Sequence, residues 1–302
     1  MPSVAVTRRR RSRGGHPRPA PKRPGSPKSS TTRARRCVVL KFGGELLEQP
    51  QDVARIARGI RTLAAKAAVT VVHGGGKEID AALALAGIPK RQVDGLRVTD
   101  APTLDAVVAV LAGSINTRLV AAVRQAGGAP VGLTGADAGV AVMKRAAPIM
   151  STAGETVDLG LVGTPAAGGD PALLAELMAK GYVPVVACVG ATKQGQLLNV
   201  NADTLASHLA ARLKAARLVI AGGTAGVLDA EGRTIGRLTA RDAAKLVKAG
   251  TANKGMVAKL QACRDALKQG VGDVLVANGR RLEFETLGDG TAQQPDCTQV
   301  VR

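Results

Sequence analysis

The sequence predicts an α/β sandwich in which helices cover both faces of a sheet of parallel strands. Short apolar runs rich in Val recur along residues 37–302, without the polar alternation of a sheet that faces water. Helical patterns separate these runs, and such alternation of strands and helices is typical of α/β proteins. The stretch is long enough for one large unit or for two lobes.

The predicted strands are continuous apolar runs whose lengths suit buried strands. They lie at residues 37–42, 69–73, 129–133, 183–189, 217–221 and 273–277. Glycines punctuate the segment 138–163, which predicts hairpins there.

The predicted helices lie between the strands and are bounded by capping residues or glycines. The helix at 102–126 has Thr99 or Asp100 as its N-cap and Pro102 in its first turn. Gly250 and Gly270 end two others. The full set is 52–66, 77–86, 102–126, 202–213, 239–249 and 255–269.

The formal net charge of +19 is concentrated at the N-terminus. Residues 1–36 carry 12 Lys and Arg, six prolines and no acidic residue, which leaves +7 for residues 37–302. Such a segment cannot bury apolar surface, so we expect residues 1–36 to be a disordered basic tail. Its composition also fits a transit peptide, a non-specific grip on anionic polymers, a solvated extension, or a start codon placed too early.

The composition also argues against several classes of protein. The three aromatic residues are Phe42, Tyr182 and Phe284, too few for a surface that stacks nucleic-acid bases, so nucleic acid is expected only as a non-specific contact of the tail. The four cysteines are far apart without a CxxC pair, which argues against a zinc site or a disulfide scaffold. No apolar run approaches the ~20 residues that span a bilayer. We expect a cytoplasmic protein with no membrane partner and no metal site of its own.

Two glycine runs follow predicted parallel strands. Lys41 ends the strand 37–42 and is followed by Phe42, Gly43 and Gly44, at the edge where ligands of α/β proteins bind. His73 ends the strand 69–73, and Gly74, Gly75 and Gly76 lead into a helix whose free N–H groups favour an anion. Taken alone, Lys41 also fits a surface lysine before an ordinary glycine turn.

Three further clusters carry polar groups at helix starts. Asn199 and Asn201 alternate on an extended segment, so both face one side. Asn201 can cap the helix that follows, and Asp203 falls in the first turn of that helix. Lys259 lies near the start of the helix 255–269, where an anionic ligand would compensate its charge. Arg97 precedes the helix 102–126 and can hold a carboxylate with two hydrogen bonds. Each also has a structural explanation: a capped helix, an exposed lysine, or an arginine that caps a carbonyl.

Taken in order, the segments KFGG, HGGG, GLRVTD, LLNVNAD and GMVAK resemble the amino-acid kinase family, and within it the kinases that act on N-acetyl-L-glutamate. The resemblance covers nearly all of residues 37–302. It implies a three-layer αβα sandwich with a largely parallel central sheet. It also implies an N-terminal lobe, 37–212, for the amino-acid substrate and dimerisation, and a C-terminal lobe, 213–302, for ATP.

The resemblance implies roles for eleven residues. The lysines that stabilise the transferring phosphoryl group, and the acid that orients them, would be Lys41, Lys259 and Asp203. The acylated amino acid would be held, with its α-carboxylate on the arginine, by Gly75, Gly76, Arg97, Asn199 and Asn201. Phosphate would accept hydrogen bonds from the N–H groups of Gly43, Gly44 and Gly74. Gly75 would contact both phosphate and the acylated amino acid.

The implied reaction is phosphorylation of the side-chain carboxylate of N-acetyl-L-glutamate by ATP, with Mg²⁺ arriving on the nucleotide, in arginine biosynthesis. A kinase for aminoadipate or another N-acyl glutamate derivative fits the same residues. A non-catalytic amino-acid sensor and a nucleic-acid binder driven by the tail are alternatives from other classes.

The sequence departs from the family pattern at two positions. Gly223 stands near the place of a common acidic residue, and Ala136 stands where a lysine is frequent. The six prolines of residues 1–36 also exclude the N-terminal helix that links dimers into hexamers in some relatives. We therefore expect a homodimer that does not form rings.

Overall fold

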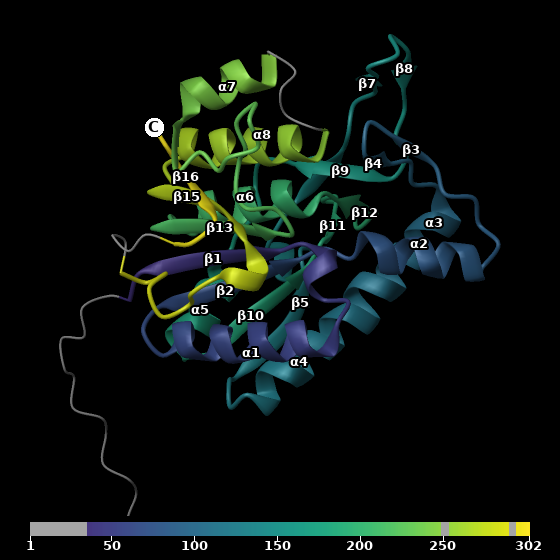
Figure 1. Cartoon of the computed structure of the whole chain (residues 1–302). Coiled ribbons are helices and arrows are strands. Elements are labelled where there is room, and N and C mark those ends of the chain that lie inside the picture. The colour runs from purple at the N-terminus through teal and green to yellow at the C-terminus, as the bar shows by residue number, and fades with distance from the viewer. Residues whose placement is uncertain (1–34, 249–253, 290–293) are drawn as a thin grey trace, which may run out of the picture. The chain divides into compact units, whose positions relative to one another are not determined.

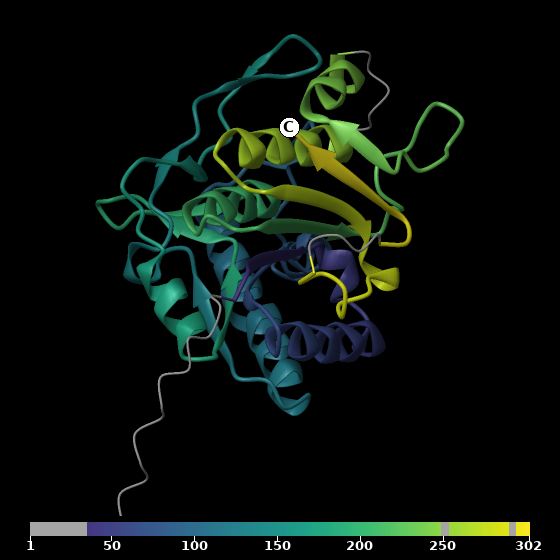
Figure 2. The ribbon, with the colours of Figure 1, turned by 90° about the vertical axis from the view of Figure 1, so that its left-hand side faces the viewer.

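The structure, a computed structural model, describes residues 35–248, 254–289 and 294–302. The expected tail, apart from Arg35 and Arg36, lies outside the described residues. Residues 35–302 form a unit of three layers, with a sheet between two layers of helices (Figures 1 and 2). This confirms the predicted fold class.

The central sheet has eight strands and is mostly parallel. Only β15 and β16 run antiparallel to each other in it. Across the sheet the order is β14 (Arg237–Thr239), β16 (Cys297–Val301), β15 (Asp273–Asn278), β13 (Arg217–Gly222), β1 (Cys37–Phe42), β2 (Ala68–His73), β10 (Val183–Ala187) and β5 (Pro130–Thr134).

The helices cover the two faces of this sheet. On one face α1 (Pro50–Ala64) packs against α4 (Asn116–Gln125), and on the other α6 (Ala202–Arg212) packs against α8 (Lys254–Lys268) (Figure 1). The remaining helices are α2 (Gly76–Leu85), α3 (Ala101–Val108), α5 (Ala172–Ala179) and α7 (Ala240–Lys248). Residue 249, the last of the predicted helix 239–249, lies outside the described residues.

The predicted helix 102–126 is a single helix with an irregular middle. Asp100 is its N-cap, because its side chain accepts a hydrogen bond of 3.0 Å from the Thr103 N–H. The segment Ala109–Ile115 is a π-helix between α3 and α4, which hydrophobic spacing does not reveal. By length and composition the stretch Ala101–Gln125 could also cross a membrane. Here it packs against α1, α2, β5 and β10, and 39% of its most apolar window is buried inside the protein.

Short strands form smaller sheets outside the central sheet. One small sheet has the order β11 (Val189–Ala191), β12 (Leu197–Val200), β9 (Val162–Pro165) and β6 (Met143–Arg145). The hairpins β3 (Gln92–Val93) with β4 (Leu96–Arg97) and β7 (Ile149–Met150) with β8 (Thr156–Val157) complete it. The predicted hairpins in 138–163 are therefore confirmed, whereas the predicted strand 183–189 divides at Cys188 between two sheets.

Pairing within the central sheet brings the glycine runs together. β1 lies between β2 and β13, with Lys41 in register with Val72 on one side and Ile220 on the other. All three strands are parallel, so their carboxyl ends meet at one edge. The core beneath is aliphatic, with Phe42 and Phe284 as a ring pair whose centroids lie 6.4 Å apart. The predicted lobe boundary between residues 212 and 213 stays a prediction, since strands from both sides of it share this sheet.

Candidate active site

The loops after β1 and β2 pack backbone against backbone. The Gly74 N–H donates a hydrogen bond of 3.1 Å to the Phe42 carbonyl. A Cβ atom on Gly44 would lie 2.8 Å from the Gly75 Cα, so only glycine fits there without movement of the backbone. Helix α2 starts directly after Gly75, which caps it without a side chain. The N-terminal N–H groups of this helix therefore face the glycine loops and favour an anion.

Lys41 and Asp203 form a buried ion pair. The Lys41 Nζ lies 2.8 Å from the Asp203 Oδ1, and the two side chains are 7% and 8% exposed. Asp203 is fixed in the first turn of α6, because the Asn201 side chain caps this helix at the N–H groups of Asp203 and Thr204. Burial disfavours the charged lysine, but the charge and hydrogen bond of Asp203 outweigh it, so the pKa of Lys41 is raised. The ammonium group is therefore charged at neutral pH.

A cavity of about 240 Å³ opens at this edge of the sheet. Nine of the eleven predicted site residues line it: Lys41, Gly43, Gly44, Gly74, Gly75, Gly76, Arg97, Asn199 and Asn201. Asp203 belongs to the same place through its ion pair with Lys41. The structure thus brings together residues that are far apart in the sequence.

Arg97 enters the cavity with one end of its guanidinium group occupied. Its Nη2 donates to the Gly76 carbonyl at 3.2 Å and to the Asp80 carboxylate. The Nη1 is buried and has no hydrogen-bond partner in the described part of the chain. Burial disfavours the Asp80 carboxylate, but hydrogen bonds from Lys90 and Arg97 outweigh this and lower its pKa. The Asp80 carboxylate therefore holds Arg97 in place, and the Nη1 group remains available to donate a hydrogen bond to a ligand.

Lys259 lies at the edge of this site, outside the cavity lining. It projects from α8, and its Cε would lie 3.7 Å from a Cβ atom on Gly222, at the end of β13. The Oε1 of Glu45 would lie 3.2 Å from that same point. Glu45 also lines the cavity and contributes to the raised pKa of Lys41, so this carboxylate lies beside both lysines.

Two buried side chains near Lys41 were not among the predicted residues. His73 Nε2 lies 3.1 Å from the Asn116 Nδ2, and burial lowers the pKa of the imidazole to about 4. Cys188 lines the cavity, donates to the His73 carbonyl at 2.7 Å, and has its pKa raised to about 12 by burial, which the charge of Lys41 only partly opposes. The buried imidazole contacts Gly74 and Asn116, and the thiol donates to a backbone carbonyl, so both side chains are occupied in supporting the structure at the end of β2.

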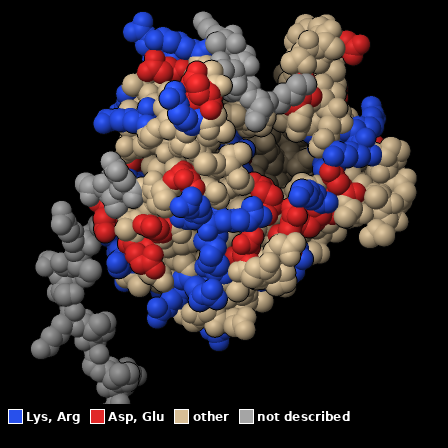
Figure 3. All heavy atoms as spheres, in the orientation of Figure 1, with Lys and Arg blue, Asp and Glu red and all other residues tan. Residues whose placement is uncertain are grey.

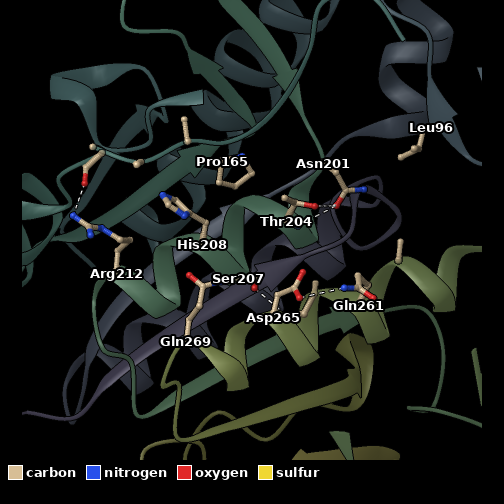
Figure 4. A pocket seen from close by; sticks show the side chains of 16 residues that line it. Leu96, Pro165, Asn201, Thr204, Ser207, His208, Arg212, Gln261, Asp265 and Gln269 are labelled. Atoms are coloured by element: carbon tan, nitrogen blue, oxygen red, sulfur yellow. Dashed lines mark hydrogen bonds between the residues drawn. The ribbon is translucent and has the colours of Figure 1, made fainter. Parts of the chain in front are cut away.

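A second cavity, of about 640 Å³, adjoins the first. Side chains of α6, including His208, Ser207 and Thr204, line it together with Gln261 and Asp265 of the neighbouring helix α8 (Figure 4). Leu96 and Asn201 line both cavities. The face is hollowed between α8 and the β7–β8 hairpin, and basic and acidic side chains are interspersed around it (Figure 3).

No group of three or more His, Cys, Asp or Glu side chains suited to a metal ion occurs in residues 35–248, 254–289 and 294–302. The carboxylate of Glu45 is the only one among the residues that line the smaller cavity.

Comparison with known proteins gives the family. A model of the amino acid kinase family matches residues 36–278. The chain belongs to this family. It is 39% identical over 225 residues to an acetylglutamate kinase of Bradyrhizobium diazoefficiens, covering 73% of this chain and 76% of that one. It is 42% identical over 224 residues to an acetylglutamate kinase of Solibacter usitatus, covering 73% and 82%.

A solved structure supports the amino acid kinase fold. An N-acetylglutamate synthase from Neisseria gonorrhoeae, complexed with coenzyme A and N-acetyl-glutamate, superimposes with a TM-score of 0.74 at 23% identity. The match covers 88% of this chain but 59% of that longer one. At this identity the likeness concerns the fold alone.

Proposed function

We propose that the protein transfers the γ-phosphoryl group of ATP to the side-chain carboxylate of N-acetyl-L-glutamate, which forms an acyl phosphate for arginine biosynthesis. One observation carries the proposal. A charged lysine, two glycine loops and an arginine with an unpartnered donor meet in one cavity. Relatives about 40% identical that are named acetylglutamate kinase support the choice of substrate.

The chemistry requires charge stabilisation and no general base. A glutamate side chain has a pKa of about 4.3, so the acceptor carboxylate is already ionised at neutral pH. The barrier comes from repulsion between this carboxylate and the phosphates, about 4 kcal/mol for one pair of unit charges 4 Å apart at an effective dielectric constant of 20.

The residues of the cavity offset this repulsion. Lys41, held by Asp203, and Lys259 supply positive charge, and Gly44 supplies an N–H group that needs no reorganisation as charge moves. The N–H groups of Gly43 and Gly74 already donate to the carbonyls of Ala221 and Phe42, so the prediction that these two N–H groups bind phosphate is wrong for this structure. Gly75, Gly76, Asn199 and Asn201 complete the pocket for the acylated amino acid. Arg97 binds its α-carboxylate through Nη1. Mg²⁺ enters as part of the MgATP substrate and neutralises phosphate charge.

The organisation of the chain belongs to the same proposal. Residues 37–212 hold the amino-acid substrate and the dimer contact, and residues 213–302 hold ATP. The protein is a cytoplasmic homodimer, and light scattering tests its assembly: a hexamer contradicts the proposal.

Trapping the product with hydroxylamine tests the reaction. Acyl phosphates react with hydroxylamine to give a hydroxamate, which is coloured once iron(III) is added. We expect this product with ATP, Mg²⁺ and N-acetyl-L-glutamate. N-acetyl-L-glutamine, which lacks the side-chain carboxylate, is the matched negative substrate. A stronger signal with α-aminoadipate or another N-acyl glutamate assigns a sister kinase, and binding without product assigns a sensor. Activity retained after deletion of residues 1–34 argues against a function that depends on the tail.

The roles of the two lysines are tested in the same assay. Lys41→Ala and Lys259→Ala should each lower kcat by about 10²–10³-fold, the effect of removing one preorganised donor. Lys66→Ala removes an exposed lysine next to α1 and is the control. Near-normal turnover in both site variants would reject these roles.

A further inference from the structure

The side chain of Glu45 is folded back over the loop after β1. A Cβ atom on Gly43 would overlap both of its carboxylate oxygens, so this conformation needs glycine at 43. Oε1 accepts a hydrogen bond of 3.0 Å from the Gly223 N–H, beyond the end of β13. The Glu45 carbonyl accepts one of 3.0 Å from Arg280 Nη2, which holds the backbone of the same residue. The carboxylate therefore bridges the ends of two neighbouring strands.

Two lysine side chains lie near this carboxylate. Glu45 contributes to the raised pKa of Lys41, and Lys259 approaches the Glu45 Oε1 beside Gly222. In the part of the chain that the structure describes, Lys259 forms no ion pair, with Glu45 or with any other carboxylate. Glycine N–H groups flanked by two ammonium groups are the donors that bind phosphate oxygens in proteins. Here the carboxylate of Glu45 accepts a hydrogen bond from one such group, the Gly223 N–H.

We infer that Glu45 competes with the phosphates of the nucleotide for this position, and that ATP displaces its carboxylate from the Gly223 N–H. The inference rests on the proposed function. The carboxylate and a phosphate oxygen are both anions that need the same donors, so they exclude each other. When only a fraction of the molecules has the carboxylate turned away, the apparent affinity for ATP is the affinity of the open site multiplied by that fraction. A site that is open one tenth of the time binds about tenfold more weakly than an open one.

Direct binding to the full chain tests the inference without turnover. Isothermal titration with ATP and excess Mg²⁺, in the absence of an acceptor, compares the wild type with E45Q and E45D. Glutamine keeps the size of the side chain but removes its charge, and aspartate keeps the charge on a shorter side chain. We expect E45Q to lower the Kd for ATP by about three- to tenfold, and E45D to lower it by less. Adenosine, which has no phosphate, should bind all variants equally.

Glu48 provides the matched control. It lies in the same loop, but its carboxylate pairs with Lys77 at 3.1 Å and does not line the cavity. E48Q should leave the Kd for ATP unchanged, and an equal gain in E48Q would reduce the effect to net charge and overturn the inference.

The outcomes separate the inference from the proposed function. An unchanged or higher Kd for ATP in E45Q, with binding intact in the wild type, overturns the inference alone. If E45Q raises the Kd for ATP in the presence of Mg²⁺ but not in EDTA, Glu45 is instead a ligand of the nucleotide's metal ion. This result also overturns the inference. Failure of the wild type and of E45Q to bind ATP refutes the proposed function together with the inference.

Discussion

Replacement of Asp203 by Asn isolates the buried ion pair. The variant keeps the shape of the side chain but leaves the Lys41 ammonium group buried without its counter-charge. At the 2.8 Å between Lys41 Nζ and Asp203 Oδ1, the attraction is about 6 kcal/mol for an effective dielectric constant of 20. Desolvation of the two groups offsets part of this, so we expect the free energy of unfolding to fall by about 3–5 kcal/mol.

The same change should alter the pH dependence of the reaction. In the wild type, burial alone would lower the pKa of Lys41, and Asp203 reverses this to a raised pKa. The stability that this lysine contributes is therefore complete below its ordinary pKa and is lost only as pH rises through the raised value. Without Asp203 the effect of burial dominates, and the pKa falls below its ordinary value. In D203N, kcat should decrease as pH rises through a range in which the wild-type kcat is still constant.

Two measurements check this prediction. Urea unfolding gives the loss of stability, and a coupled assay of ADP release between pH 6 and 10 gives kcat. Asp105→Asn removes an equal charge from an exposed position of α3 and should change neither. If D203N unfolds within 0.5 kcal/mol of the wild type and its pH profile is parallel, Asp203 does not hold the charge on Lys41, and the reasoning fails.

Three further variants test neighbouring features. Arg97→Lys removes the Nη1 donor, so the KM for N-acetyl-L-glutamate should rise by about 10–100-fold while the Kd for ATP stays constant; a change in both would contradict the assignment of Arg97. Gly44→Ala forces a Cβ against the Gly75 backbone and should cost about 1–3 kcal/mol in urea, whereas Gly76→Ala meets no atom within 4 Å and should keep its stability. The pKa of buried His73 is lowered to about 4, so the unfolded chain binds an extra proton below pH 6.5. Stability should fall by about 3 kcal/mol as pH drops from 6.5 to 4, and His73→Gln should lack this part of the slope.

The sequence predicts an element best where burial or a local cap alone determines its structure. The run CVVLKF becomes β1 with the predicted bounds, because strands covered on both faces must be apolar throughout. Asn201 caps α6 as predicted, since a cap depends on residues within one turn. β16 was missed because CTQVV has little apolar signal, and its antiparallel pairing with β15 depends on tertiary contacts.

The meeting of Lys41 with the glycines after β2 could be predicted because parallel pairing brings the ends of β1 and β2 to one edge. Arg97 lies on the separate antiparallel hairpin β3–β4, so its place in the same cavity was expected only from the family resemblance. The contacts of these side chains could not be predicted. Arg97 is anchored by Asp80, a residue of α2 that no local pattern connects to it. The thiol of Cys188 reaches the cavity because the chain bends between β10 and β11, where the apolar run continues without a break.

Glu45 shows why one unusual position cannot be interpreted in sequence alone. Gly223 looks like the loss of an acidic group, yet its N–H holds the carboxylate of Glu45, which lies 178 positions earlier in the chain. The parallel pairing of β1 and β13 places these two residues together, since each lies just beyond the end of its strand. A side chain at position 223 would have to share this space with the Glu45 Cγ, 3.7 Å from the Cβ position. An anionic group is therefore present at this edge of the sheet. Because it is carried on the long side chain of Glu45, it can turn away when phosphate arrives. An acidic residue fixed at the end of β13 could do so less easily.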